Sequence, residues 1–204
     1  MKKIMFNDRY GLTKAVLEGR KTQTRRIAYD GDIEKPRVGY GLHNAEEDKC
    51  ILHDNWMQVA ISHYKIGEEV AIAQSYDDIY MEKNAPCPIP DEYRLNAYNK
   101  GFNQGHKGWK NKMFVSADDM PFRIKITNIR IERLQDISED DCLNEGLEWA
   151  HGLFYVNYNK ETGSRINLGN DYRNAFATLI DKISGKGTWE SNPWVFVYDF
   201  ELIK

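Results

Sequence analysis

The chain lacks the features that mark exported, membrane-spanning or disulfide-stabilised proteins. No apolar run approaches the ~20 residues needed to cross a bilayer, and residues 1–8 become polar too soon for a signal peptide. The three cysteines, Cys50, Cys87 and Cys142, are odd in number and far apart, which excludes a disulfide framework and indicates free thiols. We therefore expect a cytoplasmic protein that does not contact a membrane.

Signals for metals and nucleotide cofactors are also scarce. Cys50 and His53 have the spacing of metal ligands, but no second close pair completes a tetrahedral site. The sequence contains neither a GxGxxG fingerprint nor a P-loop. We therefore expect no metal and no cofactor. The net charge of −3 does not indicate a general nucleic-acid binder, so any anion-binding surface must be local.

The chain does have enough apolar residues for one sizeable core. It has 204 residues, of which 41% are hydrophobic and 29% are charged, as is typical of a globular domain. We interpret residues 1–204 as a single mixed α/β (α+β) domain. Stretches rich in glycine, charge or aromatic residues predict insertions at about residues 28–48, 77–112 and 150–169. The second of these is too aromatic for a plain linker, which indicates an ordered insertion.

Hydrophobic patterning predicts mainly strands, with few helices. Residues 122–134 alternate as a strand, and a change of phase near Asn128 predicts a bulge or bend of the kind that barrels use at corners. Ser138 opens a short helix that ends at Gly146. These elements favour a closed or nearly closed barrel with helices packed outside. The other expected elements are a strand at 3–6, a helix at 9–18, a hairpin of 49–53 with 56–62, a strand at 70–73, a helix capped by Asn170 and a strand at 194–203.

A basic segment, Gly19–Arg26, follows the first expected helix, and with three later segments it resembles the ASCH family. The four matching segments occur in the family's order, and their flanking pattern is similar to that of the longer ASCH proteins found in phages and prophages. The resemblance implies a PUA-like β-barrel with flanking helices, long insertions and a cleft suited to RNA or a modified nucleoside. The segments are Leu17–Arg26, Lys65–Val70, Met120–Leu147 and Trp189–Phe200.

Some small ASCH proteins are amidohydrolases that remove the acetyl group of N4-acetylcytidine with a lysine, a threonine and a glutamate. By position in the motif, the resemblance implies Lys21, Thr24 and Glu145 in these roles. The residue types suit the reaction. Nearby cations depress a lysine pKa so that it can act as a base, a threonine supplies the hydroxyl, and a carboxylate shuttles protons or holds the lysine. Because residues 21 and 24 would face opposite sides of a regular strand, a shared site requires a turn or an irregular strand start between them.

Substrate or nucleic-acid binding is expected from Arg20, Thr22, Arg25 and Arg26, and from Trp109 in the second insertion. The arginines would contact phosphates, while Trp109 would either stack on a base or anchor the insertion to the body. Three alternatives remain open. A Gly-Arg-Lys-Thr stretch taken alone is an ordinary solvated basic turn, the same cleft suits a non-catalytic RNA-binding or regulatory module, and the insertions suit a phage-associated protein-interaction module.

Overall fold

The computed structural model describes a mixed α/β protein, which confirms the predicted class. Within the described residues, no helix has both the length and the apolar character needed to cross a bilayer. The backbone is described at residues 1–28, 33–34, 49–53, 57–83, 85, 87–157 and 164–203, and the side chains at the same residues except 33–34, 49–53, 57–61 and 157.

A five-stranded sheet in the order β1-β6-β7-β11-β2 forms the centre of the molecule. β1 pairs with β6 in parallel, and the other neighbours are antiparallel. Among the described residues no ladder joins the edge strands β1 and β2, so the sheet is open and the expected closed barrel is not confirmed. The strands are β1 (Lys2–Ile4), β6 (Glu69–Ile72), β7 (Arg123–Arg133), β11 (Trp194–Ile203) and β2 (Gln23–Ile27).

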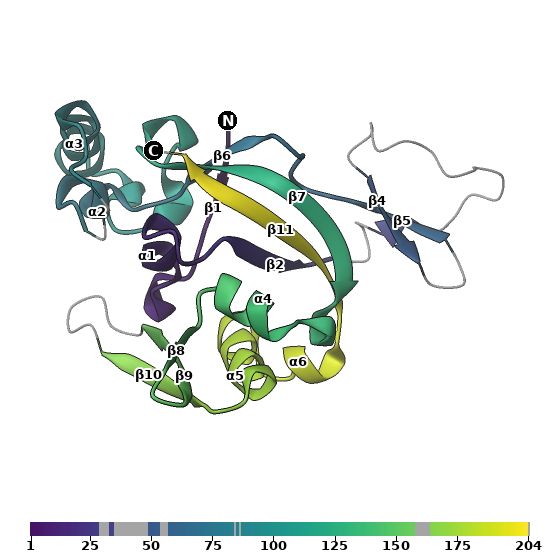
Figure 1. Cartoon of the computed structure of the whole chain (residues 1–204). Coiled ribbons are helices and arrows are strands. Elements are labelled where there is room, and N and C mark those ends of the chain that lie inside the picture. Colours follow the sequence, from purple (N-terminus) through teal and green to yellow (C-terminus); the bar gives the residue numbers. More distant parts are fainter. Residues whose placement is uncertain are drawn as a thin grey trace.

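The two longest strands, β7 and β11, bend together into an arc, and α1, α4 and α5 lie on its concave side (Figure 1). Asp199 of β11 pairs with Asn128 of β7, whereas the next residue, Phe200, pairs with Ile126. Thr127 is therefore the extra residue of a β-bulge, which confirms the irregularity predicted near Asn128. A bulge increases the local bend and twist of a strand, so this position contributes to the curvature that shelters the helices.

The first helix, α1 (Leu12–Leu17), is shorter than the predicted helix at 9–18. Asn7 caps a separate 3₁₀ turn, η1 (Asp8–Tyr10), and Gly11 then adopts a left-handed φ of 65° that starts the α-helix anew. The end was predicted correctly, because Gly19 has a φ of 74° that favours glycine.

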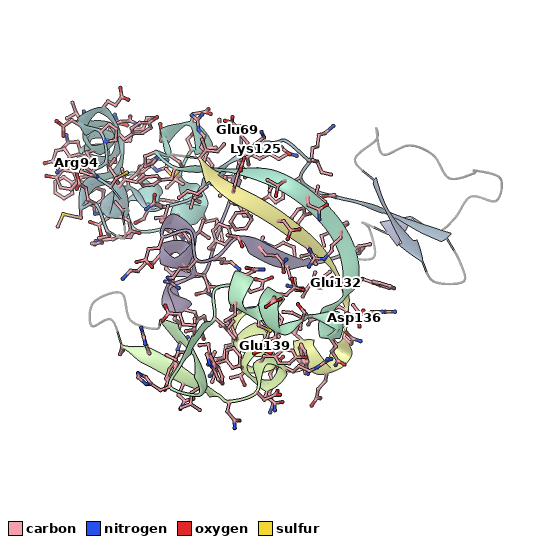
Figure 2. All side chains as sticks on the ribbon, viewed as in Figure 1. Glu69, Arg94, Lys125, Glu132, Asp136 and Glu139 are labelled. Atoms are coloured by element: carbon pink, nitrogen blue, oxygen red, sulfur yellow. The ribbon has the colours of Figure 1, made fainter. Side chains whose placement is uncertain are left out.

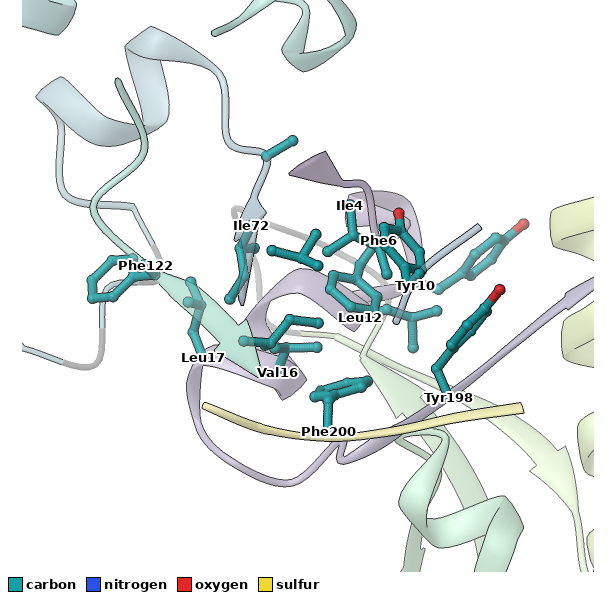
Figure 3. Close-up of a cluster of buried hydrophobic side chains, with 14 of the residues drawn as sticks. Ile4, Phe6, Tyr10, Leu12, Val16, Leu17, Ile72, Phe122, Tyr198 and Phe200 are labelled. Atoms are coloured by element: carbon teal, nitrogen blue, oxygen red, sulfur yellow. The ribbon is translucent and has the colours of Figure 1, made fainter. Parts of the chain in front are cut away.

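The helix α1 packs its apolar face into the main core beneath the sheet. Figure 3 shows Leu12 and Val16 of this helix beside Ile4, Phe6 and Phe200. All five side chains are buried. Burial of large apolar side chains is the main favourable contribution to folding, at about 1.5–3 kcal/mol for each, so the core fixes the end of α1 where the basic segment begins.

Two further helices lie on the concave side. α4 (Glu139–Asn144) begins with a capping box in which Ser138 and Asp141 bond reciprocally to each other's backbone N–H groups, and it ends before Gly146, as predicted. α5 (Tyr172–Ser184) is capped by Asp171 rather than by Asn170, so that predicted cap was wrong by one residue. The short turns nearby are η6 (Leu134–Asp136) and α6 (Thr188–Ser191).

The predicted insertions contain regular structure where they are described. The 150–169 stretch contributes two strands to a small antiparallel sheet of β8 (Glu148–Ala150), β9 (Leu153–Asn157) and β10 (Arg165–Gly169). The predicted hairpin is confirmed as β4 (Lys49–His53) paired with β5 (Met57–Ile61). β3 (Ile33–Glu34) also pairs with β5, so this part of the 28–48 stretch is a strand rather than the expected loop. Most of the remaining 28–48 stretch lies outside the described residues.

The 77–112 stretch is ordered into helical turns at the end of the molecule away from α5 (Figure 1), as the aromatic content predicted. Its π-helical segment η2 continues directly from α3. Its elements, with the turns on either side, are α2 (Tyr76–Tyr80), α3 (Asp91–Ala97), η2 (Tyr98–Asn103), η3 (Lys107–Trp109), η4 (Lys112–Phe114) and η5 (Ala117–Asp119). We call residues 76–119 the helical insertion.

Candidate functional site

The basic segment leaves α1 in an irregular conformation and becomes a strand only at Gln23. The backbone N–H groups of Arg20 and Lys21 both donate to the Ala15 carbonyl oxygen, at 2.9 and 3.0 Å, and that of Thr22 donates to the Asn144 carbonyl oxygen at 3.0 Å. Lys21 therefore precedes the regular part of β2. This is the irregular strand start that a shared site for residues 21 and 24 requires.

Lys21, Thr24 and Glu145 line one cavity of about 340 Å³. Lys21 and Thr24 reach it from the start of β2, and Glu145 reaches it from the C-cap of α4. The rest of the wall comes from the segment before α1 and from α1, β2, η6, α5 and β11. The structure thus brings together the three residues to which the resemblance assigned chemistry.

Lys21 and Glu145 form a buried ion pair at this wall. The Lys21 Nζ donates to the Glu145 Oε2 at 2.5 Å, to the Glu145 carbonyl oxygen at 2.8 Å and to the Gln23 carbonyl oxygen at 2.7 Å. Three acceptors account for all three hydrogens of an ammonium group. Burial lowers the pKa of Lys21, with smaller lowering effects from the charges of Arg26 and Arg25, while Glu145 opposes the change. The pair therefore holds a proton in a place where burial disfavours the charged amine.

Thr24 lines the same cavity as this pair. It is buried, and it is paired with Tyr198 of β11. Among the described residues, no hydrogen bond engages its hydroxyl group.

Arg25 is the most enclosed arginine of the segment, with a side chain that is 1% exposed. Its guanidinium pairs with Glu132 at 2.6 Å, with Asp141 at 2.9 Å and with Glu145 at 3.2 Å. Glu132 lies near the end of β7, close to α4 (Figure 2). Arg25 was expected to contact phosphates. It does line the cavity, but its guanidinium is already paired with three carboxylates, an arrangement that does not favour contact with an anion.

The other three residues of the segment lie nearer the surface. Arg20 pairs with Glu18 at 2.7 Å and with Glu148 at 2.9 Å, and it does not line the cavity. Thr22 is exposed and also lies outside the cavity wall. Arg26 is exposed and does line the cavity, where its Nη2 donates to the Met5 carbonyl oxygen at 2.6 Å. Arg26 is therefore the arginine of this segment best placed to meet a ligand at the cavity.

Trp109 does not line the cavity. Its ring packs within the helical insertion, 5.5 Å from the Phe102 ring and 6.1 Å from the Tyr80 ring, measured between centroids. This environment fits the alternative in which Trp109 anchors the insertion, and it removes Trp109 from the candidate site.

The sequence did not predict the apolar residues of the cavity wall. Phe176, Leu179, Ile180 and Ile183 of α5 line the cavity together with Leu134. Their helical spacing was visible in the sequence, but the same spacing is typical of a helix packed on a core. The spacing of apolar residues along a helix is the same whether they line a cavity or pack in a core, so the sequence does not distinguish the two.

In the part of the chain that the structure describes, no group of three or more His, Cys, Asp or Glu side chains is arranged to hold a metal ion. No family model, curated protein or solved structure matches the chain. The candidate function therefore depends on the residues that line the cavity: a buried lysine–glutamate pair, Thr24 and apolar side chains of α5.

Proposed function

We propose that the chain is an ASCH-type protein with a PUA-like fold, and that its cavity binds a modified nucleoside, free or within RNA, and hydrolyses an acylated nucleobase amide of the N4-acetylcytidine type. One observation carries the proposal. Lys21, Thr24 and Glu145 converge on one cavity although Lys21 and Glu145 are 124 residues apart in the chain. The bulged arc of β7 and β11 is also of the kind used at the corners of barrels.

The cavity has the size and the lining that a nucleobase needs. Small-molecule sites commonly occupy about 300–1,000 Å³ and are mostly apolar, with a few polar groups that fix orientation. The cavity of about 340 Å³ falls at the lower end of that range. In the proposed complex the flat base lies against α5, where Phe176 and Ile180 line the wall, and the exocyclic acyl amide faces Thr24.

The proposed reaction proceeds through an ester of Thr24. A proton moves from Lys21 to Glu145, which leaves a neutral amine to accept the Thr24 hydroxyl proton as the oxygen attacks the acyl carbon. The bond between that carbon and the exocyclic nitrogen then breaks, and Glu145 donates its proton to the departing amine. Water next hydrolyses the ester, which releases a carboxylic acid and restores Thr24.

The test is turnover of N4-acetylcytidine by the purified protein, followed by chromatographic separation of cytidine. Thr24→Val keeps the size of the side chain and removes the nucleophile, so we expect the rate to fall by more than about a hundredfold. Thr22→Val is the matched control, since Thr22 lies outside the cavity wall, and it should retain the wild-type rate. An inactive wild type, or an equally active Thr24→Val variant, would disprove the hydrolase.

A second candidate is a module that binds the same ligand without turnover. The observation that favours it is the full set of acceptors around Lys21, because an ammonium group with three acceptors is well suited to stay charged and structural. In this case cytidine and N4-acetylcytidine bind unchanged, and Arg26 contacts a neighbouring phosphate when the ligand is RNA.

Turnover separates the two candidates, and titration calorimetry with a short RNA at two salt concentrations tests the binding module itself. The binding module predicts that affinity falls as salt rises, because contacts with phosphates release counterions. It also predicts weaker binding by Arg26→Ala and unchanged binding by Arg20→Ala. An affinity that is the same at both salt concentrations, and the same in wild type and Arg26→Ala, contradicts the binding module.

A further inference from the structure

Arg25 contacts two carboxylates on one face of α4, the helix that carries Glu145. Asp141 is the third residue of α4 and Glu145 is its C-cap, so the two carboxylates are four residues apart and lie on the same face of the helix. The Arg25 Nη2 donates to the Asp141 Oδ2 at 2.9 Å, and the Nη1 donates to the Glu145 Oε1 at 3.2 Å. One guanidinium therefore bridges one helical turn, from Asp141 to the C-cap.

The other side of the same guanidinium is fixed to the sheet. Its Nε and Nη2 donate to the Glu132 Oε1 of β7 at 3.1 and 2.6 Å, and its Nη1 donates to the Gln23 Oε1 at 2.5 Å. Arg130 in turn donates from its Nε to the Glu132 Oε2 and from its Nη2 to the Asp141 Oδ1, each at 3.1 Å. The carboxylates that face Arg25 are thus held from a second direction.

This arrangement gives the two oxygens of Glu145 separate partners. Oε1 accepts from Arg25 and Oε2 accepts from Lys21. The planar fork of an arginine can serve several acceptors at fixed angles, whereas a lysine at the same place is a single point charge on a flexible stem. An arginine is therefore required for this geometry, and positive charge alone does not reproduce it.

We propose that Arg25 is a positioning residue, which through α4 and Glu132 holds the Glu145 carboxylate in the one orientation that leaves Oε2 to Lys21. The inference rests on the proposed function for its effect on turnover. The claim that Arg25 orients the Glu145 carboxylate toward Lys21 does not depend on any reaction.

The experiment uses the full chain with ¹³C-labelled lysine. The Lys21 side-chain resonance is assigned with Lys21→Met and compared in wild type, Arg25→Lys and Arg130→Lys. Arg130→Lys is the matched control because it replaces another guanidinium of the same network, one that forms no contact with Glu145. We expect Arg25→Lys to move the Lys21 resonance, and Arg130→Lys, which loosens Glu132 and Asp141 but does not contact Glu145, to move it by less. If Arg25→Lys does not fold, Glu132→Gln weakens the anchor on the sheet and should move the resonance in the same direction by less.

Turnover is measured on the same proteins. Arg25→Lys should lower kcat for N4-acetylcytidine by at least about tenfold while KM changes by less than about threefold, as expected when an interaction that matters in the transition state is lost. A wild type without turnover disproves the proposed hydrolysis and does not affect the resonance test. A Lys21 resonance that is unmoved by Arg25→Lys, or moved equally by Arg130→Lys, overturns the role of Arg25 whatever the activity.

Discussion

The cavity and the helical insertion both place cations beside carboxylates and aromatic rings, but they do so at opposite degrees of burial. At the cavity, the side chains of Lys21 and Arg25 are each 1% exposed. In the insertion, Lys110 and Lys83 pair with Asp77 while 72% and 40% of their side chains stay exposed. The same kinds of residue therefore form a closed network in one region and a solvated one in the other.

The difference indicates where function is to be sought. Burying a charged group is costly. Burial lowers the pKa of Lys21, and Lys21 lines the cavity, which is the kind of place where perturbed groups mark functional sites. Surface pairs carry little energy, and the aromatic rings of the insertion are packed on one another. The cavity has the character of a site, and the insertion has the character of an element held by packing. Four experiments test that contrast.

The largest effect is expected from removing one partner of the buried pair. Glu145→Leu leaves the Lys21 ammonium buried without its carboxylate, so we expect the free energy of unfolding to fall by about 3–5 kcal/mol. Urea denaturation measures it. The double variant Lys21→Met/Glu145→Leu removes both charges and should recover most of the loss. If Glu145→Leu lowers the free energy of unfolding by less than about 1 kcal/mol, the buried pair contributes no more than a surface pair, and the two regions do not differ in this respect.

The next effect tests whether packing holds the insertion. A Cβ added at Gly101 would lie 2.5 Å from the Trp109 Cε3 and 2.8 Å from the Tyr76 Cβ, closer than these atoms can approach. Gly101→Ala should therefore destabilise the protein by about 1–3 kcal/mol, since overpacking forces neighbours out of place. Asn103→Ala, at an exposed position of the same π-helical turn, is the control and should change stability little. Equal midpoints in thermal denaturation would show that the rings are loosely packed.

A smaller effect depends on pH. The Tyr76 hydroxyl donates to the Asp119 Oδ2 at 2.6 Å, and burial, followed by this bond, raises the pKa of Tyr76 from 10.0 to about 12. Because the folded pKa lies above the unfolded one, the contribution is fully present below pH 10 and is lost as pH rises through 12. Tyr76→Phe should cost about 1 kcal/mol at neutral pH and lose stability less steeply in alkali than wild type. Urea midpoints measured from pH 7 to 11 report both, and parallel curves would contradict the assignment.

The smallest effect is expected from the solvated pair. Lys110→Ala removes the 2.9 Å contact with Asp77 and should cost less than about 1 kcal/mol, with the difference shrinking in high salt. Lys107→Ala, which removes an exposed lysine from the same insertion, serves as the reference. A cost for Lys110→Ala comparable to that of Glu145→Leu would mean that the insertion relies on charge as much as the cavity does.

Local patterns predicted those parts of the fold whose cause is local. β11 was recognised over its full length because β-branched and aromatic residues run from Trp194 to Ile203. The bulge near Asn128 followed from a change in alternation, and α4 followed from the capping box at Ser138. The cap of α5 was missed by one residue because Asn170 and Asp171 are both good cap acceptors.

The site was predictable only in part. The motif placed Lys21 and Thr24 together, and the resemblance added Glu145, which the structure brings to the same cavity. Nothing in the sequence connected Arg25 with Glu132 and Asp141, which are 107 and 116 residues away. Contacts at such separations depend on how strands and helices pack, and single-sequence patterns do not contain that information.

By itself the sequence determined the long strands β7 and β11, the cap of α4 and a run of cations at the end of the first helix. It did not determine which cations become buried. Arg20, Lys21, Arg25 and Arg26 lie within a few residues of one another and look equivalent in the sequence. Only the tertiary structure made Lys21 and Arg25 interior and left Arg26 exposed. The physical reason is that a buried cation needs compensating acceptors, and here those acceptors come from β7 and α4, far away in the chain.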